Sequence, residues 1–184
     1  LGSSASEILI SGDQSETITA KNVIIATGSN PRALPGADFD EKLILSNAGA
    51  LAIPEVPKRL GVIGAGVIGL EIGTIFAKLG SKVTVVEFLD AVLPVIEKDM
   101  AVPVTRNLTK LGVDVFTSSK AKSWSKKGKR LEVVAETPEG TRHIVCDKIL
   151  VAVGRAPRTK DLGLEKLGVE LDKHGHIVVD GEML

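Results

Sequence analysis

Residues 59–71 of this chain read Arg-Leu-Gly-Val-Ile-Gly-Ala-Gly-Val-Ile-Gly-Leu-Glu. Residues 59–63, which are apolar after Arg59, predict a buried strand, and residues 67–79 repeat apolar side chains at the spacing of a helix. Gly80 is typical of a residue that ends a helix, and residues 82–87 form a second apolar run of strand length. Together these segments predict one strand–helix–strand unit and therefore a parallel sheet.

Three glycines lie where the first strand passes into the helix. Gly64, Gly66 and Gly69 follow the pattern G-x-G-x-x-G. In this setting the first glycine permits a tight turn, the second lets the backbone approach a pyrophosphate, and the third lets helix and strand pack closely, with Gly73 extending that contact. The helix N-terminus adds free N–H groups and the positive end of the helix dipole. The motif therefore predicts a dinucleotide site, whereas the same glycines without this context could form a purely structural turn.

Glu87 ends the second predicted strand. A carboxylate at this position accepts hydrogen bonds from the adenine-ribose hydroxyls of NAD and would repel the 2′-phosphate of NADP. Residues 87–93 contain no Arg or Lys that could receive such a phosphate. The sequence therefore predicts a preference for NAD over NADP.

The composition argues against several classes of partner. A hydrophobic content of 43% and a mean hydropathy of +0.21 indicate a buried interior. No apolar run reaches the roughly 18 residues that a membrane span requires. The 23 basic and 23 acidic residues balance, and only 3% of residues are aromatic, so neither a basic surface nor stacking platforms for nucleic acid are expected. We expect a soluble protein that binds neither nucleic acid nor membranes.

Further elements flank this unit. Before it we expect a small hairpin over residues 7–19, an apolar strand at residues 23–27 and a short helical turn near residues 46–51. After it we expect a helix from about Asp99 to residue 111, with Asp99 as its N-cap. Pro103 would then lie close enough to the cap for its missing N–H to cost little.

A hairpin over residues 131–136 and 141–146 and a buried strand at residues 148–153 complete the pattern, after a strand at residues 113–116. The fold class is therefore α/β, with a doubly wound, Rossmann-like parallel sheet that carries an antiparallel β insertion. We interpret residues 126–130 as a solvated basic turn.

Cys146 is the single cysteine, so it cannot form an internal disulfide, and we expect it to be a small buried residue in a strand. His143, His174 and His176 show neither a metal-ligand spacing nor an evident carboxylate partner. We therefore predict no metal site.

Two further glycine turns follow apolar runs, at residues 26–32 (Ala-Thr-Gly-Ser-Asn-Pro-Arg) and 154–158 (Gly-Arg-Ala-Pro-Arg). Each alone could be a structural turn. Together with residues 64–71 and with Val-Glu-Phe-Leu at 86–89, they resemble the flavoprotein disulfide reductases that bind two dinucleotides, the class I pyridine nucleotide-disulfide oxidoreductases. Within that family the resemblance is strongest to the dihydrolipoamide dehydrogenases. It extends to residues 162–165 and 175–180 and so covers essentially the whole chain.

The resemblance implies roles for particular residues. Val67 would be the gating side chain above the nicotinamide pocket, and Glu71 would face the flavin and pair with a lysine beside the redox disulfide. Glu87 would hold the adenine ribose, and Ala121 would lie along the adenine. The implied NAD contacts are Gly64, Ala65, Gly66, Val67, Ile68, Gly69, Leu70, Glu71, Glu87, Ala121 and Gly154, and the implied FAD contacts are Thr27, Gly28 and Ser29.

The same resemblance implies a domain division. Residues 1–46 would be the end of a flavin-domain segment with its connection, residues 47–170 the NAD-binding domain, and residues 171–184 the start of the return to the flavin domain. The chain would then be a part of a longer enzyme.

The resemblance also shows which catalytic groups this sequence lacks. The family uses a C-x-x-x-x-C pair and a His–Glu pair, and neither occurs here. We therefore expect no catalytic residue in this chain and no activity from it alone. In the intact homodimer, dihydrolipoamide carried on the acyltransferase of a 2-oxo acid dehydrogenase complex would reduce the disulfide, and electrons would pass through FAD to NAD, in the cytoplasm or the mitochondrial matrix.

Two alternatives stay open at this point. One is another NADH-using flavoprotein, such as a mercuric reductase or a peroxide reductase. The other is a stand-alone NAD-sensing module in which binding changes contacts with a partner. The flavin-facing turn at Thr27–Ser29 would have no purpose in such a module.

Overall fold

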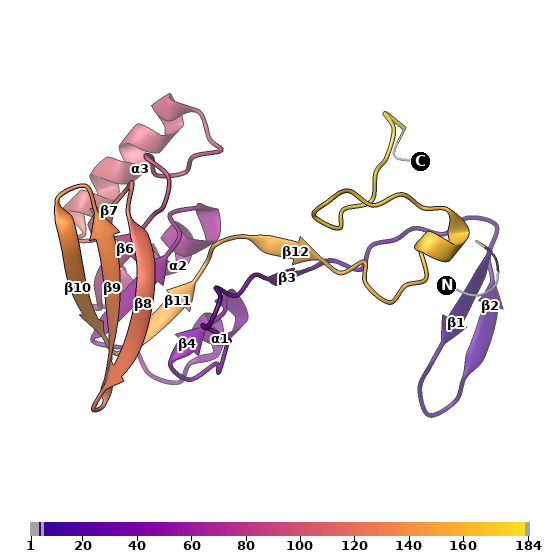
Figure 1. The fold of residues 1–184 in the computed structure, drawn as a ribbon, viewed down its shortest axis with the longest axis horizontal. Helices are drawn as coiled ribbons and strands as arrows, with labels where there is room; N and C mark the ends of the chain where they lie inside the picture. The colour runs from indigo at the N-terminus through magenta and orange to yellow at the C-terminus, as the bar shows by residue number, and fades with distance from the viewer. Residues whose placement is uncertain (1–3, 5, 183–184) are drawn as a thin grey trace. The chain divides into compact units, whose positions relative to one another are not determined.

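The computed structural model describes residue 4 and residues 6–182, which form two compact units (Figure 1). One unit combines the residues up to Asn30 with those from Arg155 onward, and the other comprises Pro31–Gly154. The expected assignment of residues 1–46, 47–170 and 171–184 to flavin and NAD domains stays a prediction, and residues 1–3, 5, 183 and 184 lie outside the described part.

A parallel sheet of five strands forms the centre of the larger unit. The chain winds outward from one central strand to two neighbours and then returns to that strand's other side. Such a reversal leaves a crevice at the carboxyl ends of the two central strands, where open α/β sheets bind their ligands. The strand order is β4 (Ile44–Leu45), β11 (Lys148–Val151), β5 (Arg59–Ile63), β6 (Lys82–Val86) and β7 (Asp114–Phe116), with parallel pairing throughout.

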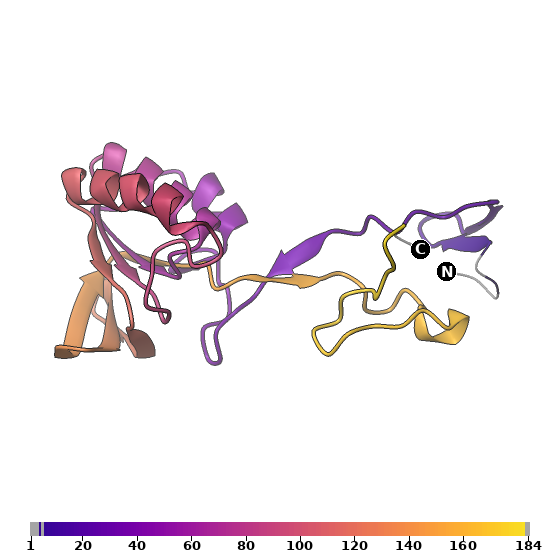
Figure 2. The same ribbon diagram turned by 90° about the horizontal axis from the view of Figure 1, so that it is seen from above.

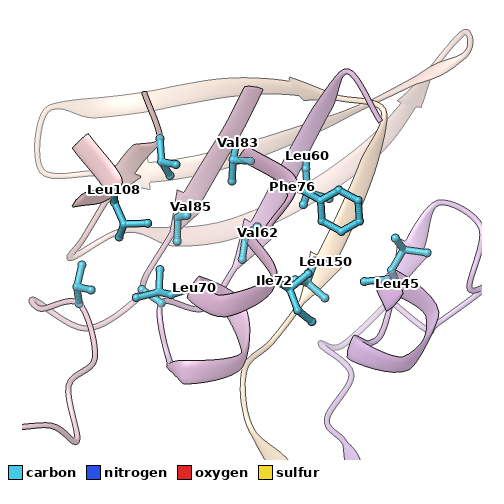
Figure 3. Packing of buried hydrophobic residues seen from close by; sticks show 14 residues of the cluster. Leu45, Leu60, Val62, Leu70, Ile72, Phe76, Val83, Val85, Leu108 and Leu150 are labelled. Atoms are coloured by element: carbon cyan, nitrogen blue, oxygen red, sulfur yellow. The ribbon is translucent and has the colours of Figure 1, made fainter. Parts of the chain in front are cut away.

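Three helices cover one face of this sheet: α1 (Asn47–Ala52), α2 (Val67–Lys78) and α3 (Lys98–Lys110) (Figure 2). Their apolar stripes pack on alternate residues of the strands, which produces one buried cluster. Figure 3 shows this packing, with Leu60, Val62, Val83 and Val85 from the strands, Leu70, Ile72 and Phe76 from α2, and Leu108 from α3.

An antiparallel sheet of three strands covers the other face. It consists of β8 (Lys120–Lys127), β9 (Arg130–Thr137) and β10 (Gly140–Cys146), with β9 in the middle. Its residues Leu131, Val133 and Cys146 pack with Ile63, Ile149 and Val151 in a second buried cluster. After Lys148, the residues of β11 are all apolar and buried, as is typical of a central parallel strand that is covered on both faces.

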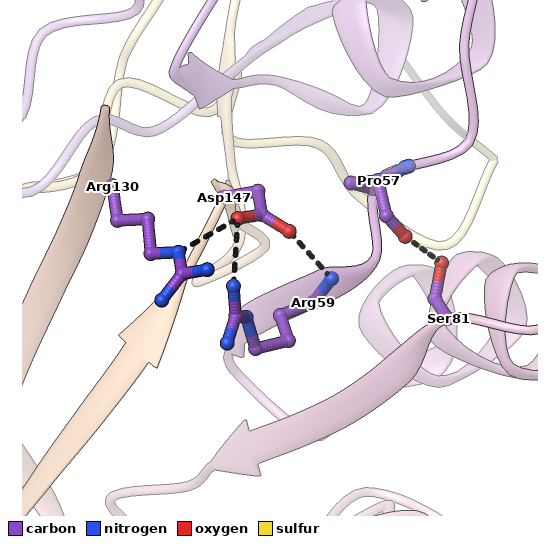
Figure 4. A network of polar contacts seen from close by, with 5 residues as sticks. All are labelled: Pro57, Arg59, Ser81, Arg130 and Asp147. Carbon is purple, nitrogen blue, oxygen red and sulfur yellow. Dashed lines mark hydrogen bonds and ion pairs between the residues drawn. The ribbon is translucent and has the colours of Figure 1, made fainter.

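Polar contacts hold the amino ends of the parallel strands together (Figure 4). The carboxylate of Asp147 accepts a hydrogen bond from the backbone N–H of Arg59 at 2.9 Å. It also lies 3.3 Å from a guanidinium nitrogen of Arg59 and 3.8 Å from Arg130 Nε. Ser81 Oγ donates to the carbonyl of Pro57 at 2.5 Å. These contacts join β5 to the strands beside it at the edge of the sheet opposite the glycine turn.

The expected α/β class is confirmed, with a parallel sheet and an antiparallel insertion. The predicted strands at residues 59–63 and 82–87 and the helix at residues 67–79 occur within a residue of their expected bounds. None of the helices in the described ranges is long and apolar enough to cross a membrane.

The expected Asp99 cap is wrong. Helix α3 begins earlier, after Glu97, which makes no side-chain cap bond, and Asp99 lies inside the first turn. Pro103 therefore lies beyond the positions whose N–H groups are free in any helix, and it removes a backbone bond that another residue would make. The carboxylate of Asp99 is placed to interact with the helix dipole.

Two strand predictions also differ from the structure. Strand β8 was missed because the sequence Lys120–Lys127 is mostly polar and exposed, and a bulge between Ala121 and Ser123 breaks its two-residue period. Residues 23–27 form no strand, and the side chain of Ile24 is 90% exposed. A strand needs a hydrogen-bonded neighbour, and no described strand pairs with this run.

The smaller unit contains the expected hairpin, β1 (Glu7–Ile10) with β2 (Glu16–Thr19), in antiparallel register. It also contains a short 3₁₀ turn at Glu165–Leu167. Strand β12 (Arg155–Pro157) pairs with β3 (Ser29–Pro31), which joins the two glycine turns that the sequence analysis singled out.

Gly69 and Gly73, one turn apart on α2, provide a matched test of this packing. A methyl group at Gly69 would overlap the carbonyl oxygen of Gly64, whereas one at Gly73 would lie 3.6 Å from Val83 Cγ1, an ordinary contact. We expect Gly69→Ala to lower the free energy of unfolding by about 1–3 kcal/mol. Gly73→Ala should leave it unchanged or raise it by up to about 1 kcal/mol, because Ala favours a helix. Urea unfolding measures both, and equal effects would contradict this account of α2.

Candidate dinucleotide-binding site

The glycine turn at the end of β5 has a backbone that only glycine can adopt at its first position. Gly64 has a φ of +106°, and a Cβ there would overlap the carbonyl oxygen of Ala152 at the end of β11. Its N–H donates to the carbonyl of Val86 at 2.9 Å. The turn is thereby held at the carboxyl ends of all three central strands.

Gly66 has a different reason to be glycine. Its backbone is extended, with φ of −75° and ψ of 180°, so other residues could adopt it. A Cβ at Gly66 would meet no atom within 4 Å. The first N–H groups of any helix have no intrahelical partner, and Gly66, the N-cap of α2, has no side chain that could cap them. Open space, free donors and the positive end of a helix dipole fit a pyrophosphate group.

Ala65, between these glycines, is completely buried. Its N–H donates to Oε2 of Glu87 at 2.5 Å, and its carbonyl accepts from the N–H of Leu93 at 3.0 Å. The turn is therefore fixed by hydrogen bonds on both sides of Ala65.

Glu87 is 7% exposed and lies just beyond β6. Its other carboxylate oxygen, Oε1, accepts from the N–H of Leu89 at 2.8 Å. The sequence predicts this carboxylate as a ligand of the ribose, but it contains no signal for either backbone partner. Because a carboxylate can accept about four hydrogen bonds, both oxygens still have capacity for ribose hydroxyls.

The other residues of α2 that are predicted to contact the cofactor differ in solvent exposure. The side chain of Val67 is 55% exposed, and Glu71 is exposed as well. Leu70 is buried in the cluster under the helices, and Ile68 packs against that cluster. Leu70 could therefore meet a ligand only through its backbone.

Ala121, which no local feature marks, follows a segment that lies beside Glu87. The N–H of Ser119 donates to the carbonyl of Glu87 at 2.8 Å, and the N–H of Ser118 donates to the carbonyl of Leu89 at 2.7 Å. Ala121 is the first partly buried residue of β8. Gly154 follows β11 with a φ of +111°, and its carbonyl accepts from the N–H of Arg32 at 3.0 Å.

The predicted flavin turn, Thr27–Ser29, belongs to the smaller unit. Thr27 Oγ1 donates to the carbonyl of Arg158 at 2.6 Å, and Ser29 Oγ accepts from Arg155 Nε at 2.7 Å. Gly28 has a φ of +76° and accepts from the N–H of Arg158. Both hydroxyls are thus engaged by the second glycine turn, which the sequence did not indicate.

A groove of about 360 Å³ lies at the amino ends of β5, β6 and β7, beside β10. None of the predicted cofactor residues lines it. Its basic side chains already have partners, since Lys82 lies 3.3 Å from Asp114 and Arg142 pairs with Glu139. Within the described ranges, no group of three or more His, Cys, Asp or Glu residues could hold a metal ion.

The prediction that the histidines lack carboxylate partners is wrong for two of them. His176 Nδ1 lies 3.1 Å from Asp172, and His143 Nδ1 lies 3.5 Å from Glu132. A hydrogen bond from the backbone of His176 lowers the pKa of Asp172 to about 2. Both pairs join residues that only the folded loop or sheet brings together, and neither lies among the predicted cofactor contacts.

Comparison with known proteins points to one family. A sequence profile described as pyridine nucleotide-disulphide oxidoreductase matches residues 3–184. A mitochondrial dihydrolipoyl dehydrogenase of Schizosaccharomyces pombe is 43% identical over 94% of this chain and 34% of its own length. A dihydrolipoyl dehydrogenase of Geobacillus stearothermophilus is 44% identical over 94% of this chain and 36% of its own length. This chain thus spans about a third of these relatives.

Solved structures agree with the sequence matches. LpdA of Mycobacterium tuberculosis superposes with a TM-score of 0.83 at 31% identity, covering 95% of this chain and 37% of that one. The HOCl-induced flavoprotein disulfide reductase RclA of Escherichia coli, in a Cu(II) complex, superposes with a TM-score of 0.81 at 27% identity, covering 96% and 40%.

The expectation that Cys146 is a small buried residue is confirmed, since it is 1% exposed. Burial raises the pKa of its thiol to about 11. At pH 8 we expect its reaction with a disulfide reagent such as DTNB to be at least about a hundredfold slower in the folded chain than in guanidinium, because only the thiolate reacts. Absorbance at 412 nm follows the reaction, and equal rates in both states would contradict the burial.

Proposed function

This chain belongs to the pyridine nucleotide-disulphide oxidoreductase family, and we propose that it forms the NAD-binding part of a dihydrolipoyl dehydrogenase. One observation carries the proposal: the N-terminus of α2 combines free N–H groups with open space at Gly66. The names of the relatives support the activity that we propose for the whole protein.

In this proposal the pyrophosphate of NAD lies against the helix N-terminus at Gly66, and the adenine ribose donates to the carboxylate of Glu87. The adenine lies along Ala121, and the exposed Val67 borders the nicotinamide. The backbone at Gly154 completes the cleft. These residues bind and orient the cofactor and perform no bond-making step themselves.

The chemistry of the whole enzyme is proposed from its relatives' names. Dihydrolipoamide would reduce a disulfide, and NAD would accept a hydride supplied through FAD. Cys146 is the single cysteine of this chain, so the dithiol is not within it. We therefore propose that residues 47–170 supply the NAD domain and that Thr27, Gly28 and Ser29 contact FAD in the flanking segments.

The proposed partners follow from the same assignment. They are the lipoyl-bearing acyltransferase of a 2-oxo acid dehydrogenase complex and a second identical subunit. The cytoplasm is the favoured location, with the mitochondrial matrix as the alternative. A second candidate is another NADH-using flavoprotein reductase. The superposition on RclA, a flavoprotein disulfide reductase, supports the flavoprotein reductase part of this candidate.

NADH should bind this chain more tightly than NADPH. The buried carboxylate of Glu87 can accept from a free 2′-hydroxyl, and it would repel a 2′-phosphate. We expect at least about a tenfold difference in Kd, which corresponds to about 1.4 kcal/mol. Isothermal titration with both cofactors measures it. Equal affinities would argue against Glu87 as the ribose ligand, and no binding of either would argue against the NAD-binding function.

Gly66→Val should weaken NADH binding and leave the fold intact. The new side chain would project into open space in the free chain, so packing is kept. It would occupy the space proposed for the pyrophosphate, so we expect a loss of affinity of at least about tenfold. Gly73→Ala, in the same helix but facing Val62 and Val83, is the matched control and should bind normally. A parallel loss of thermal stability and affinity in Gly66→Val would make Gly66 a packing residue instead.

A further inference from the structure

We propose that Glu87 is a positioning residue for the pyrophosphate-binding turn in addition to being a ligand of the ribose. Its carboxylate would thereby link recognition of the ribose to the geometry of the phosphate site. This inference rests on the proposed NAD-binding function. It concerns a contact that exists in the chain before any cofactor arrives.

The contact between Glu87 and Ala65 is short and buried. The backbone N–H of Ala65 donates to Oε2 of Glu87, with 2.5 Å between nitrogen and oxygen. Ala65 has no exposed surface, so water cannot replace the carboxylate as the partner of this N–H. Loss of the carboxylate would leave a buried donor unpaired, and the turn would have to move to satisfy it.

Glu87 itself is held in place from several sides. Its Oε1 accepts from the N–H of Leu89. Its backbone N–H donates to Phe116 at 2.8 Å, and its carbonyl accepts from Ser119 at 2.8 Å. Hydrogen bonds hold both carboxylate oxygens and the backbone of Glu87, so its side chain has little freedom to rotate. It therefore fixes the position of the Ala65 N–H.

The turn depends on few other contacts. Gly64 donates to the carbonyl of Val86, and the carbonyl of Ala65 accepts from Leu93. Both are backbone bonds, so within the described residues Glu87 supplies the one side-chain hydrogen bond to this turn. Ala65, whose N–H Glu87 holds, directly precedes Gly66 and the free N–H groups of α2. Its orientation therefore sets where those donors point.

The charge of Glu87 matters for this arrangement. Two backbone N–H groups point at the two carboxylate oxygens, so both oxygens must be acceptors. A glutamine of the same shape has one acceptor oxygen and one NH₂ group, which would face one of these donors. Glu87→Gln thus removes one of the two acceptor oxygens and keeps the volume of the side chain.

The test separates the ribose role from the positioning role by comparing two ligands. Adenosine carries the adenine and ribose without phosphate, whereas NADH also carries the pyrophosphate. If Glu87 only binds the ribose, Glu87→Gln weakens both ligands by the same factor. We expect NADH to lose at least about tenfold more than adenosine, measured by NMR titration for adenosine and calorimetry for NADH. Equal losses would overturn the proposal.

Amide hydrogen exchange of the ligand-free chain is a second readout. The Ala65 amide should be protected in the wild type and should exchange at least about tenfold faster in Glu87→Gln, whereas Glu139→Gln, on an exposed turn, should leave it unchanged. Should Glu87→Gln fail to fold, Glu87→Asp keeps the charge but shortens the reach, and it is measured in the same way. An unprotected Ala65 amide in the wild type would overturn the proposal. A wild type that binds no NADH but protects Ala65 would refute the NAD-binding function and leave the contact standing.

Discussion

The close approach of α2 to the carboxyl ends of β5 and β11 is the constraint on which the rest of the larger unit depends. A Cβ on Gly69 would overlap the carbonyl of Gly64, and a Cβ on Gly64 would overlap that of Ala152. The helix and the strands can meet so closely only because positions 64 and 69 carry no side chain. The free N–H groups of the helix are thereby brought to the crevice between the two strands, where a phosphate can reach them.

Both faces of the sheet support this arrangement. The helices bury alternate residues of β5 and β6 on one side, and β8, β9 and β10 bury Ile63, Ile149 and Val151 on the other. Strands packed on both sides form a rigid base for a binding turn. Glu87 extends that rigidity from the end of β6 to the turn itself, since its carboxylate joins Ala65 to Leu89.

Much of the fold was predictable because its signals are local. Helical spacing, strand-length apolar runs and stop glycines placed β5, α2 and β6 within a residue. The errors arose where local signals were weak or misleading. Strand β8 is polar, bulged and mostly exposed, so only its pairing with β9 reveals it. Asp99 resembles a cap by residue type, but the helix begins before it, after Glu97.

The sequence by itself determined the strand–helix–strand unit, the three glycines at its turn and a carboxylate at the end of the second strand. These features depend on backbone conformation and on spacing along one short segment. Only the tertiary structure decided that Glu87 binds the backbone of Ala65 and Leu89, and that Arg155 binds Ser29, 126 positions away. Such contacts depend on strand order and on the depth at which each side chain is buried, and neither is encoded in the neighbouring residues.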